Sequence, residues 1–125
     1  MAKEFVKFPV SKELASKTYS TLELVSKDGK FRIGTNEATK AIEGSAALLV
    51  VIAEDVEPPE IVMHLPLLCR EKKIPFTYVP SKKDLGKAAG IEVSTAAVAV
   101  LKEGASKKEF RQLLDLVGEA SKNTA

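Results

Sequence analysis

The sequence predicts an α/β protein, a three-layer α/β/α sandwich in which helices cover both faces of a four-stranded mixed sheet. Helix and strand signals alternate along the whole chain, from a helix near residue 11 to a helix near residue 121. The run 46–53 is almost wholly aliphatic and rich in Val, and it is too short for a buried helix. It therefore predicts a central strand covered on both faces.

The first third of the chain predicts a helix, a strand and a second helix. Apolar or small residues recur at helical spacing in residues 11–27, and Ser11 can cap this helix. Its expected buried face consists of Leu14, Thr18, Leu22 and Val25. Asp28-Gly29 ends the helix, 31–33 is a short strand, and Gly34 turns the chain into a helix that Gly44 ends.

The remaining chain continues the alternation. Beyond the central strand it predicts a helix at 60–73, a strand at 76–79, a helix at 82–89, a strand at 96–101 and a helix at 106–121. Pro66 should kink or divide the helix in which it stands. The last helix is expected to bury Phe110, Leu113, Leu114 and Val117. With 125 residues we expect one domain over 1–125, with frayed ends at about 1–8 and 122–125.

The composition excludes several classes of function. A net charge of +2, with few aromatic residues and no Trp, does not fit a sequence-independent binder of nucleic acid or a binder that stacks successive bases. The single Cys69 and single His64 give no metal-ligand set and no nucleophile with a base, so we expect no metal, no cofactor and no enzyme. We find no signal peptide or membrane span and expect a cytoplasmic protein.

The segment 34–40 offers an unusual mixture of polar groups. With Asn36 at the start of its helix, Glu37 and Lys40 lie within about 100° of it on one arc. The apolar residues take another arc, and they are Ala38, Ala41 and Ile42. A carboxylate near phosphates is repelled unless it accepts hydrogen bonds from base edges, whereas Asn can both donate and accept. The mixture therefore suits the recognition of base edges.

A simpler interpretation of the same residues stays open on spacing alone. Asn36 can be an N-cap, Glu37 can favour the positive end of the helix dipole, and Glu37 with Lys40 can form an i,i+3 ion pair. Nothing in this interpretation requires a ligand.

Four motifs in order resemble one known family. They are Gly34-Thr35-Asn36-Glu37 with Lys40, the strand 48–53, His64-Leu65-Pro66-Leu67-Leu68-Cys69, and Val79-Pro80-Ser81-Lys82-Lys83-Asp84-Leu85-Gly86. Over about residues 11–117 the chain resembles the archaeal kink-turn-binding ribosomal proteins of the L7Ae family. The resemblance implies the α/β/α sandwich and binding of kink-turn RNA, an internal loop with tandem sheared G·A pairs and one extruded nucleotide.

The resemblance also implies roles for particular residues. Asn36, Glu37 and Lys40 match residues that contact the sheared guanines, while Gly34-Thr35 approaches the RNA backbone. A loop that matches 90–94 covers the extruded nucleotide and helps to choose among RNAs. Its residues here are Ile91, Glu92 and Val93.

Cations near the implied site are candidates for phosphate contacts. They are Arg32 and Lys82, and also Lys27, Lys30, Lys83 and Lys87. The chain departs from the family pattern at Ile33, where many relatives have a basic residue, and at Ser94-Thr95, where small apolar residues are frequent. The neighbouring Arg32 is expected to offset the first departure.

The implied partners are rRNA of the large ribosomal subunit and box C/D and H/ACA guide RNAs, with RNase P, and thus tRNA processing, for some members. A Nop-domain scaffold protein and, through it, fibrillarin would join the guide-RNA particles. Two alternatives stay open: a paralogue of the same fold at a single ribosomal site, and a receiver-like signalling domain that uses Asp55 and Lys102.

Overall fold

The computed structural model describes residues 10–122, so the predicted frayed ends lie outside the described residues apart from Lys122. The elements are α1 (Lys12–Val25), β1 (Lys30–Ile33), α2 (Thr35–Glu43), β2 (Leu49–Ala53), the 3-10 helix η1 (Pro59–Ile61), α3 (His64–Lys72), β3 (Phe76–Val79), α4 (Lys82–Ala88), β4 (Ala97–Lys102) and α5 (Lys107–Lys122). Every predicted helix and strand is present within a few residues of its expected bounds.

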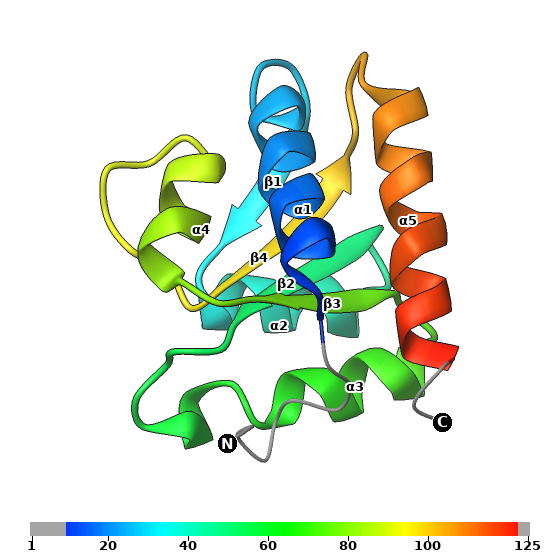
Figure 1. Cartoon of the computed structure of the whole chain (residues 1–125). Coiled ribbons are helices and arrows are strands. Elements are labelled where there is room, and N and C mark those ends of the chain that lie inside the picture. Colours follow the sequence, from blue (N-terminus) through cyan, green and yellow to red (C-terminus); the bar gives the residue numbers. More distant parts are fainter. Residues whose placement is uncertain (1–9, 123–125) are drawn as a thin grey trace.

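The four strands form one mixed sheet in the order β1-β4-β2-β3. Strands β2 and β3 are parallel, whereas β4 runs antiparallel to both β1 and β2. Helices α1, α4 and α5 pack together on one face, and α2 and α3 pack together on the other (Figure 1). The predicted three-layer sandwich is confirmed.

The core follows the predicted apolar patterns. Every residue of β2 is buried, as expected of a strand covered on both faces. The expected inner face of α1 is buried in full, and Ser11 caps this helix because its Oγ accepts a hydrogen bond from the backbone N–H of Leu14 at 3.1 Å. Phe110, Leu113 and Val117 of α5 are buried, while Leu114 is partly buried against the core.

The helix predicted over 60–73 is divided, as expected from Pro66. The break falls at residues 62–63, between η1 and α3, and Val62 is the residue whose carbonyl Pro66 would meet in a continuous helix. Pro66 is the third residue of α3, in the first turn, where a backbone N–H has no intrahelical acceptor and its loss costs no hydrogen bond. The proline therefore fits the start of the helix and does not kink it.

The strand directions gather four connections at one end of the sheet. Strands β1, β2 and β3 end there and β4 begins there. Backbone hydrogen bonds tie these connections together, from Gly34 N to Ala97 O at 2.9 Å and from Ala53 N to Ala96 O at 2.9 Å. We call this the Gly34 end, defined by residues 33–40, 53–57, 79–82 and 90–97. No helix in the described part of the chain is long and apolar enough to cross a membrane.

Candidate nucleic-acid interface

Gly34 forms the sharp turn between β1 and α2. Its φ of 100° and ψ of 156° lie in a region that L side chains rarely adopt, so glycine is required here. A Cβ added to Gly34 would meet no atom within 4 Å, so the outer side of the turn is open to a ligand. Gly34 is also the N-cap of α2, which means that the simpler interpretation of Asn36 as the N-cap is wrong.

The first backbone N–H groups of α2 have no intrahelical acceptors. The first helical hydrogen bond runs from Ala38 N to Gly34 O at 2.9 Å, and no side chain caps the helix. The N–H groups of Thr35, Asn36 and Glu37 therefore point out of the N-terminus, where the helix dipole adds partial positive charge. The open turn thus presents hydrogen-bond donors from the backbone itself.

The polar arc of α2 faces solvent as predicted. Asn36 and Lys40 are exposed and Glu37 is half-buried. The three apolar residues expected on the opposite arc, Ala38, Ala41 and Ile42, are all buried. One exposed patch therefore holds an amide, a carboxylate and an ammonium group beside the free backbone N–H groups.

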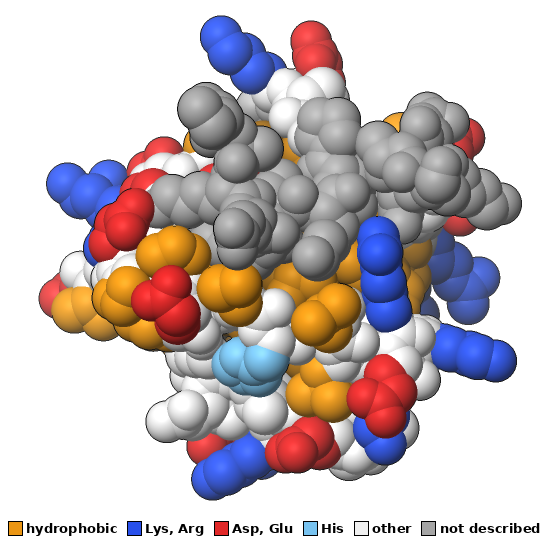
Figure 2. Space-filling model, turned by 90° about the horizontal axis from the view of Figure 1, so that it is seen from below, with side chains coloured by type: hydrophobic (Ala, Val, Ile, Leu, Met, Phe, Trp, Pro, Cys, Tyr) orange, Lys and Arg blue, Asp and Glu red, His pale blue; other side chains and the backbone are white. Residues whose placement is uncertain are grey.

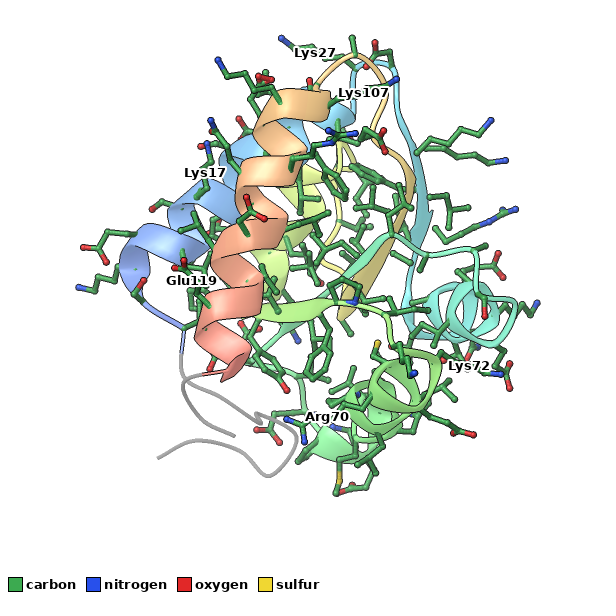
Figure 3. The ribbon with its side chains drawn as sticks, turned by 90° about the vertical axis from the view of Figure 1, so that its right-hand side faces the viewer. Lys17, Lys27, Arg70, Lys72, Lys107 and Glu119 are labelled. Atoms are coloured by element: carbon green, nitrogen blue, oxygen red, sulfur yellow. The ribbon has the colours of Figure 1, made fainter. Side chains whose placement is uncertain are left out.

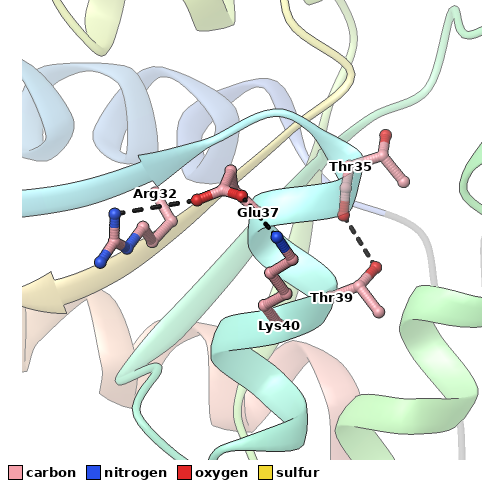
Figure 4. A network of polar contacts seen from close by, with 5 residues as sticks. All are labelled: Arg32, Thr35, Glu37, Thr39 and Lys40. Atoms are coloured by element: carbon pink, nitrogen blue, oxygen red, sulfur yellow. Dashed lines mark hydrogen bonds and ion pairs between the residues drawn. The ribbon is translucent and has the colours of Figure 1, made fainter.

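Glu37 lies between two cations (Figure 4). Its Oε2 is 3.4 Å from Nζ of Lys40, and its Oε1 is 3.7 Å from Nη1 of Arg32. All three side chains are more than two-fifths exposed, so each pair is worth about 0–1 kcal/mol. The i,i+3 pair of the simpler interpretation is therefore real but weak, and it leaves the carboxylate free to exchange these partners for a ligand.

A hollow of about 540 Å³ lies against the Gly34 turn. Its lining residues are Ile33, Gly34, Thr35, Asn36, Glu37, Ile61 and His64. Neither Ile61 nor His64 is predicted as a site residue from the sequence. No periodic signal links either residue to Gly34, because η1 and α3 reach the turn only through the packing of α3 against α2.

His64 joins the two helices through a hydrogen-bond chain. Its Nε2 lies 2.8 Å from Oγ1 of Thr39, and this hydroxyl donates to the carbonyl of Thr35 at 2.8 Å. Because the single hydroxyl hydrogen of Thr39 is used in the bond to Thr35, Nε2 of His64 donates to Thr39 in the tautomer that carries its hydrogen on Nε2. His64 is exposed, and Figure 2 shows hydrophobic side chains around it.

The loop 90–96 completes the Gly34 end. It is held on α4 by hydrogen bonds from Ile91 N to Gly86 O at 3.0 Å and from Thr95 N to Lys82 O at 3.1 Å. A Cβ at Gly86 would overlap the carbonyl oxygen of Val93, so glycine permits this close contact. Val93 is 68% exposed, which leaves a large apolar side chain in solvent.

The other residues of this loop have distinct environments. Ile91 is half-buried and Glu92 is exposed. Thr95, at one of the departures from the family pattern, is buried and donates from Oγ1 to the carbonyl of Ala97 at 3.0 Å. Ile33, at the other departure, is half-buried against the core. Both departures are therefore accommodated within the fold.

The predicted cations divide between the two ends of the sheet. Lys82 begins α4, and its backbone N–H donates to Oδ1 of Asp55 at 2.8 Å, while Arg32 lies on the edge strand β1 beside Glu37. Both border the Gly34 end. The prediction is wrong for Lys30, because it begins β1 and so lies at the opposite end of the sheet. Lys27 follows Ser26, whose Cβ would lie 3.8 Å from a Cβ at Gly90 at the start of the loop 90–96.

The receiver-like alternative fails on strand direction. Asp55 follows the end of β2, and Lys102 ends β4, which is antiparallel to β2. The two residues therefore lie at opposite ends of the sheet, and Asp55 instead accepts the hydrogen bond from Lys82 N. Its neighbour Glu54 has a raised pKa, caused first by burial and then by the charge of Asp55.

Cys69 lies in the core, on the buried side of α3. Burial raises the pKa of its thiol to about 12. The thiol is therefore neutral at physiological pH, which suits a small apolar core residue and not a nucleophile.

Comparison with known proteins identifies the same kind of chain. The family model described as "Ribosomal protein L7Ae/L30e/S12e/Gadd45 family" matches residues 16–110, which include all residues of the Gly34 end. The solved structure of "Giardia lamblia 15.5kD RNA binding protein" is similar, with a TM-score of 0.77 and 30% sequence identity. The similarity covers 90% of this chain and 92% of that one.

Proposed function

Because the chain belongs to the ribosomal protein L7Ae/L30e/S12e/Gadd45 family, it is an RNA-binding protein of ribonucleoprotein particles and not an enzyme, and we propose that its ligand is kink-turn RNA. In this proposal Asn36, Glu37 and Lys40 read the edges of the sheared G·A pairs. The protein stabilises the sharply bent RNA conformer because it binds that conformer more tightly than the extended one.

One observation carries the proposal: an accessible carboxylate stands among hydrogen-bond donors at an open glycine turn. Glu37 can accept from the exocyclic amino or imino groups of guanine, and Asn36 can donate and accept. The free N–H groups at the start of α2 and Lys40 suit phosphate oxygens. A site that bound only phosphates would gain nothing from Glu37, so its position favours contacts with bases.

The rest of the Gly34 end supplies what a bent RNA with an extruded nucleotide would need. Ile91 and the exposed Val93 offer an apolar cover for an unstacked base, and Ile61 adds an apolar wall on the other side of the Gly34 turn. Gly34 allows the backbones of protein and RNA to approach closely. Arg32 and Lys82 would contact flanking phosphates, and Glu92 would influence which loop sequences are accepted.

We propose that the protein works in several kinds of ribonucleoprotein particle. The ligands would be kink-turns in large-subunit rRNA and in box C/D and H/ACA guide RNAs, and in RNase P RNA where it has this motif. A Nop-domain scaffold, which carries fibrillarin, would dock beside the bound RNA. The exposed Ile61 on η1 and Leu67 on α3 support a protein contact there, because Ile61 lines the hollow at the Gly34 turn and Leu67 follows the lining residue His64 on α3.

The direct test compares two RNAs that differ only in the G·A pairs. Affinity is measured for a kink-turn stem and for the same stem with the G·A pairs changed to Watson–Crick pairs. We expect tighter binding of the kink-turn stem by about ten-fold or more, since each good base-edge contact contributes about 1–3 kcal/mol. Equal affinity for the two stems would contradict base-edge recognition.

Glu37→Ala tests the residue on which the proposal depends most. The variant should lose about 1–3 kcal/mol of the discrimination between the two stems, while the fold is retained because Glu37 is half-exposed. Glu43→Ala is the matched control, since Glu43 is an exposed carboxylate at the other end of the same helix. The control should keep the discrimination of the unsubstituted protein.

A further inference from the structure

Four exposed lysines gather at the end of the sheet opposite Gly34. They are Lys27, Lys30, Lys102 and Lys107. They belong to the connection between α1 and β1 and to the segment from the end of β4 to the start of α5. Figure 3 shows Lys27 and Lys107 at the same end of the molecule. We call this the Lys102 end, defined by residues 26–30 and 101–107.

Two of these lysines are neighbours across the sheet. Lys30 on β1 is the register partner of Lys102 on β4. Like charges directly opposite each other on antiparallel strands destabilise the pair. Among the described residues, none of the four lysines has a carboxylate within ion-pair distance. The positive charge is therefore not used within the fold and is available to a ligand.

The Lys102 end also holds two carboxylates, which are fewer than its lysines. Asp28 accepts a hydrogen bond at Oδ2 from Ala105 N at 3.1 Å, which ties the two connections together. Glu103 is the other acidic residue of the Lys102 end, so four lysines stand against two carboxylates. The local excess of two positive charges equals the net charge of the whole chain, which is also +2.

Close backbone contacts hold these lysines in place. A Cβ at Gly29 would overlap the carbonyl oxygen of Lys102, and a Cβ at Gly104, where φ is 65°, would overlap Asp28. The two connections can pack together this tightly only because both positions are glycine. The lysines therefore project from a fixed platform and not from independent loops.

The chemistry of this end fits phosphates better than a protein partner. The hollow beside the lysines, about 300 Å³, is lined by Asp28, Leu101, Lys102, Glu103, Gly104 and Lys107. Only Leu101 among these is a large apolar residue, whereas the centres of protein–protein interfaces are apolar and poor in lysine. Lysine ammonium groups are mobile point charges that bind phosphate without selecting a base.

We propose that the Lys102 end is a second RNA-binding surface that binds the phosphodiester backbone of an RNA duplex without regard to sequence. The two surfaces lie at opposite ends of β1, whose four residues span about 13 Å, and they adjoin where a Cβ at Gly90 would lie 3.8 Å from the Cβ of Ser26. The second duplex is either a distant part of the same RNA or another RNA. The protein would then hold a bound kink-turn next to a second RNA duplex.

The inference rests on RNA as the ligand class and does not depend on kink-turn recognition. The test uses a plain RNA duplex, a kink-turn stem with short arms, and the same stem with one arm extended by about two helical turns. The patch variant carries Lys27→Gln, Lys30→Gln, Lys102→Gln and Lys107→Gln. A control variant with the same charge change carries Lys12→Gln, Lys17→Gln, Lys72→Gln and Lys73→Gln.

The patch variant should bind the plain duplex at least ten-fold more weakly than the control variant at low salt. The slope of log K against log salt should be shallower by about 2–4, since each phosphate contact contributes about 0.9. Both variants should bind the short-armed kink-turn stem equally. If the extended stem distinguishes the variants, the second duplex is part of the same RNA; if only the separate duplex does so, it is another RNA.

Three results would overturn the inference. Equal binding of the plain duplex by the patch and control variants would show that these lysines do not contact it. Equal weakening of the short-armed stem would show that the lysines belong to the first interface. Competition by polyglutamate as effective as competition by RNA of equal charge would assign the surface to an acidic polypeptide. A fourth result would leave this inference standing and contradict only the proposed function. In that case the unsubstituted protein would bind the kink-turn stem and its Watson–Crick counterpart equally, while the patch variant would still lose binding of the plain duplex.

Discussion

The two ends of the sheet differ in the kind of charge that they present. The Gly34 end combines a carboxylate, an amide, an ammonium group and free backbone N–H groups, with apolar side chains on both sides. The Lys102 end presents four lysines, and Leu101 is the one large apolar residue that lines its hollow. Both ends are built from β1 and β4, so a single pair of antiparallel strands carries both surfaces.

Selectivity and attraction for RNA can therefore be separated in one small protein. A mixed set of donors and acceptors rewards the matching arrangement of bases and penalises a mismatch, because an unpaired buried polar group costs free energy. A set of lysines attracts any phosphate backbone by counterion release. The Gly34 end is thus suited to choose an RNA, and the Lys102 end is suited to hold one.

The largest expected effect is the salt dependence of affinity, which should differ between the two ends. Raising the salt concentration from 50 to 200 mM should weaken plain-duplex binding by about 100-fold if four phosphates are contacted. The ratio between affinities for the kink-turn stem and its Watson–Crick counterpart should change by less than about three-fold, because both stems make the same phosphate contacts. Titrations at a series of salt concentrations measure both quantities. A ratio that falls as steeply as duplex binding would mean that the Gly34 end also acts by charge alone.

Gly86→Ala should damage the Gly34 end alone. The added methyl group would overlap the carbonyl of Val93, so we expect the free energy of unfolding to fall by about 1–3 kcal/mol and the loop 91–95 to move. Selectivity for the kink-turn stem should fall with it, while plain-duplex binding should not change. Urea denaturation and the two binding assays measure these effects.

Gly118→Ala is the control for that substitution. Gly118 is a helical glycine whose added Cβ would meet no atom within 4 Å, so alanine should stabilise the protein by up to about 1 kcal/mol. Equal destabilisation by the two substitutions would show that the contact between α4 and the loop is not what makes Gly86 necessary.

Arg32→Gln should have a smaller effect and should define the role of Arg32. Its exposed pair with Glu37 contributes about 0–1 kcal/mol to stability. If Arg32 contacts a phosphate, the salt slope for the kink-turn stem should become shallower by about 0.9 without a change in selectivity. If Arg32 only positions Glu37, selectivity should fall and the slope should stay the same. No change in either would remove Arg32 from the interface.

The smallest expected effect is on the labelling of Cys69, which tests whether variants at either end keep an intact core. Its folded pKa of about 12 is raised above the ordinary value of 9.0, so the neutral thiol stabilises the fold below pH 9 and this contribution is lost as the pH rises from 9 to 12. At pH 8 a thiol reagent should label the folded protein slowly and the urea-unfolded protein fast. Variants at either end should stay protected; rapid labelling of Glu37→Ala without urea would attribute its binding defect to unfolding.

Sequence patterns predicted local structure well where one dominant force determines it. The all-aliphatic β2 and the buried faces of α1, α2 and α5 follow from the periodic burial of apolar residues. The expectation for Asn36 failed because a helix can begin directly at a glycine turn with positive φ. The expectation for Pro66 is confirmed, because a proline excludes the carbonyl four residues earlier from a continuous helix and the chain is divided there, at residues 62–63.

The polar arc of α2 follows from the amino-acid sequence, since helix geometry places Asn36, Glu37 and Lys40 together wherever that helix packs. Which distant residues join the arc depends on how the strands pair. The fold brings Ile61, His64 and the loop 90–96 to the Gly34 end, and it puts Lys30 at the other end. The physical reason is strand direction: the antiparallel course of β4 brings its first residues to Gly34 and its last residue, Lys102, to Lys30. No local pattern in the chain encodes that pairing.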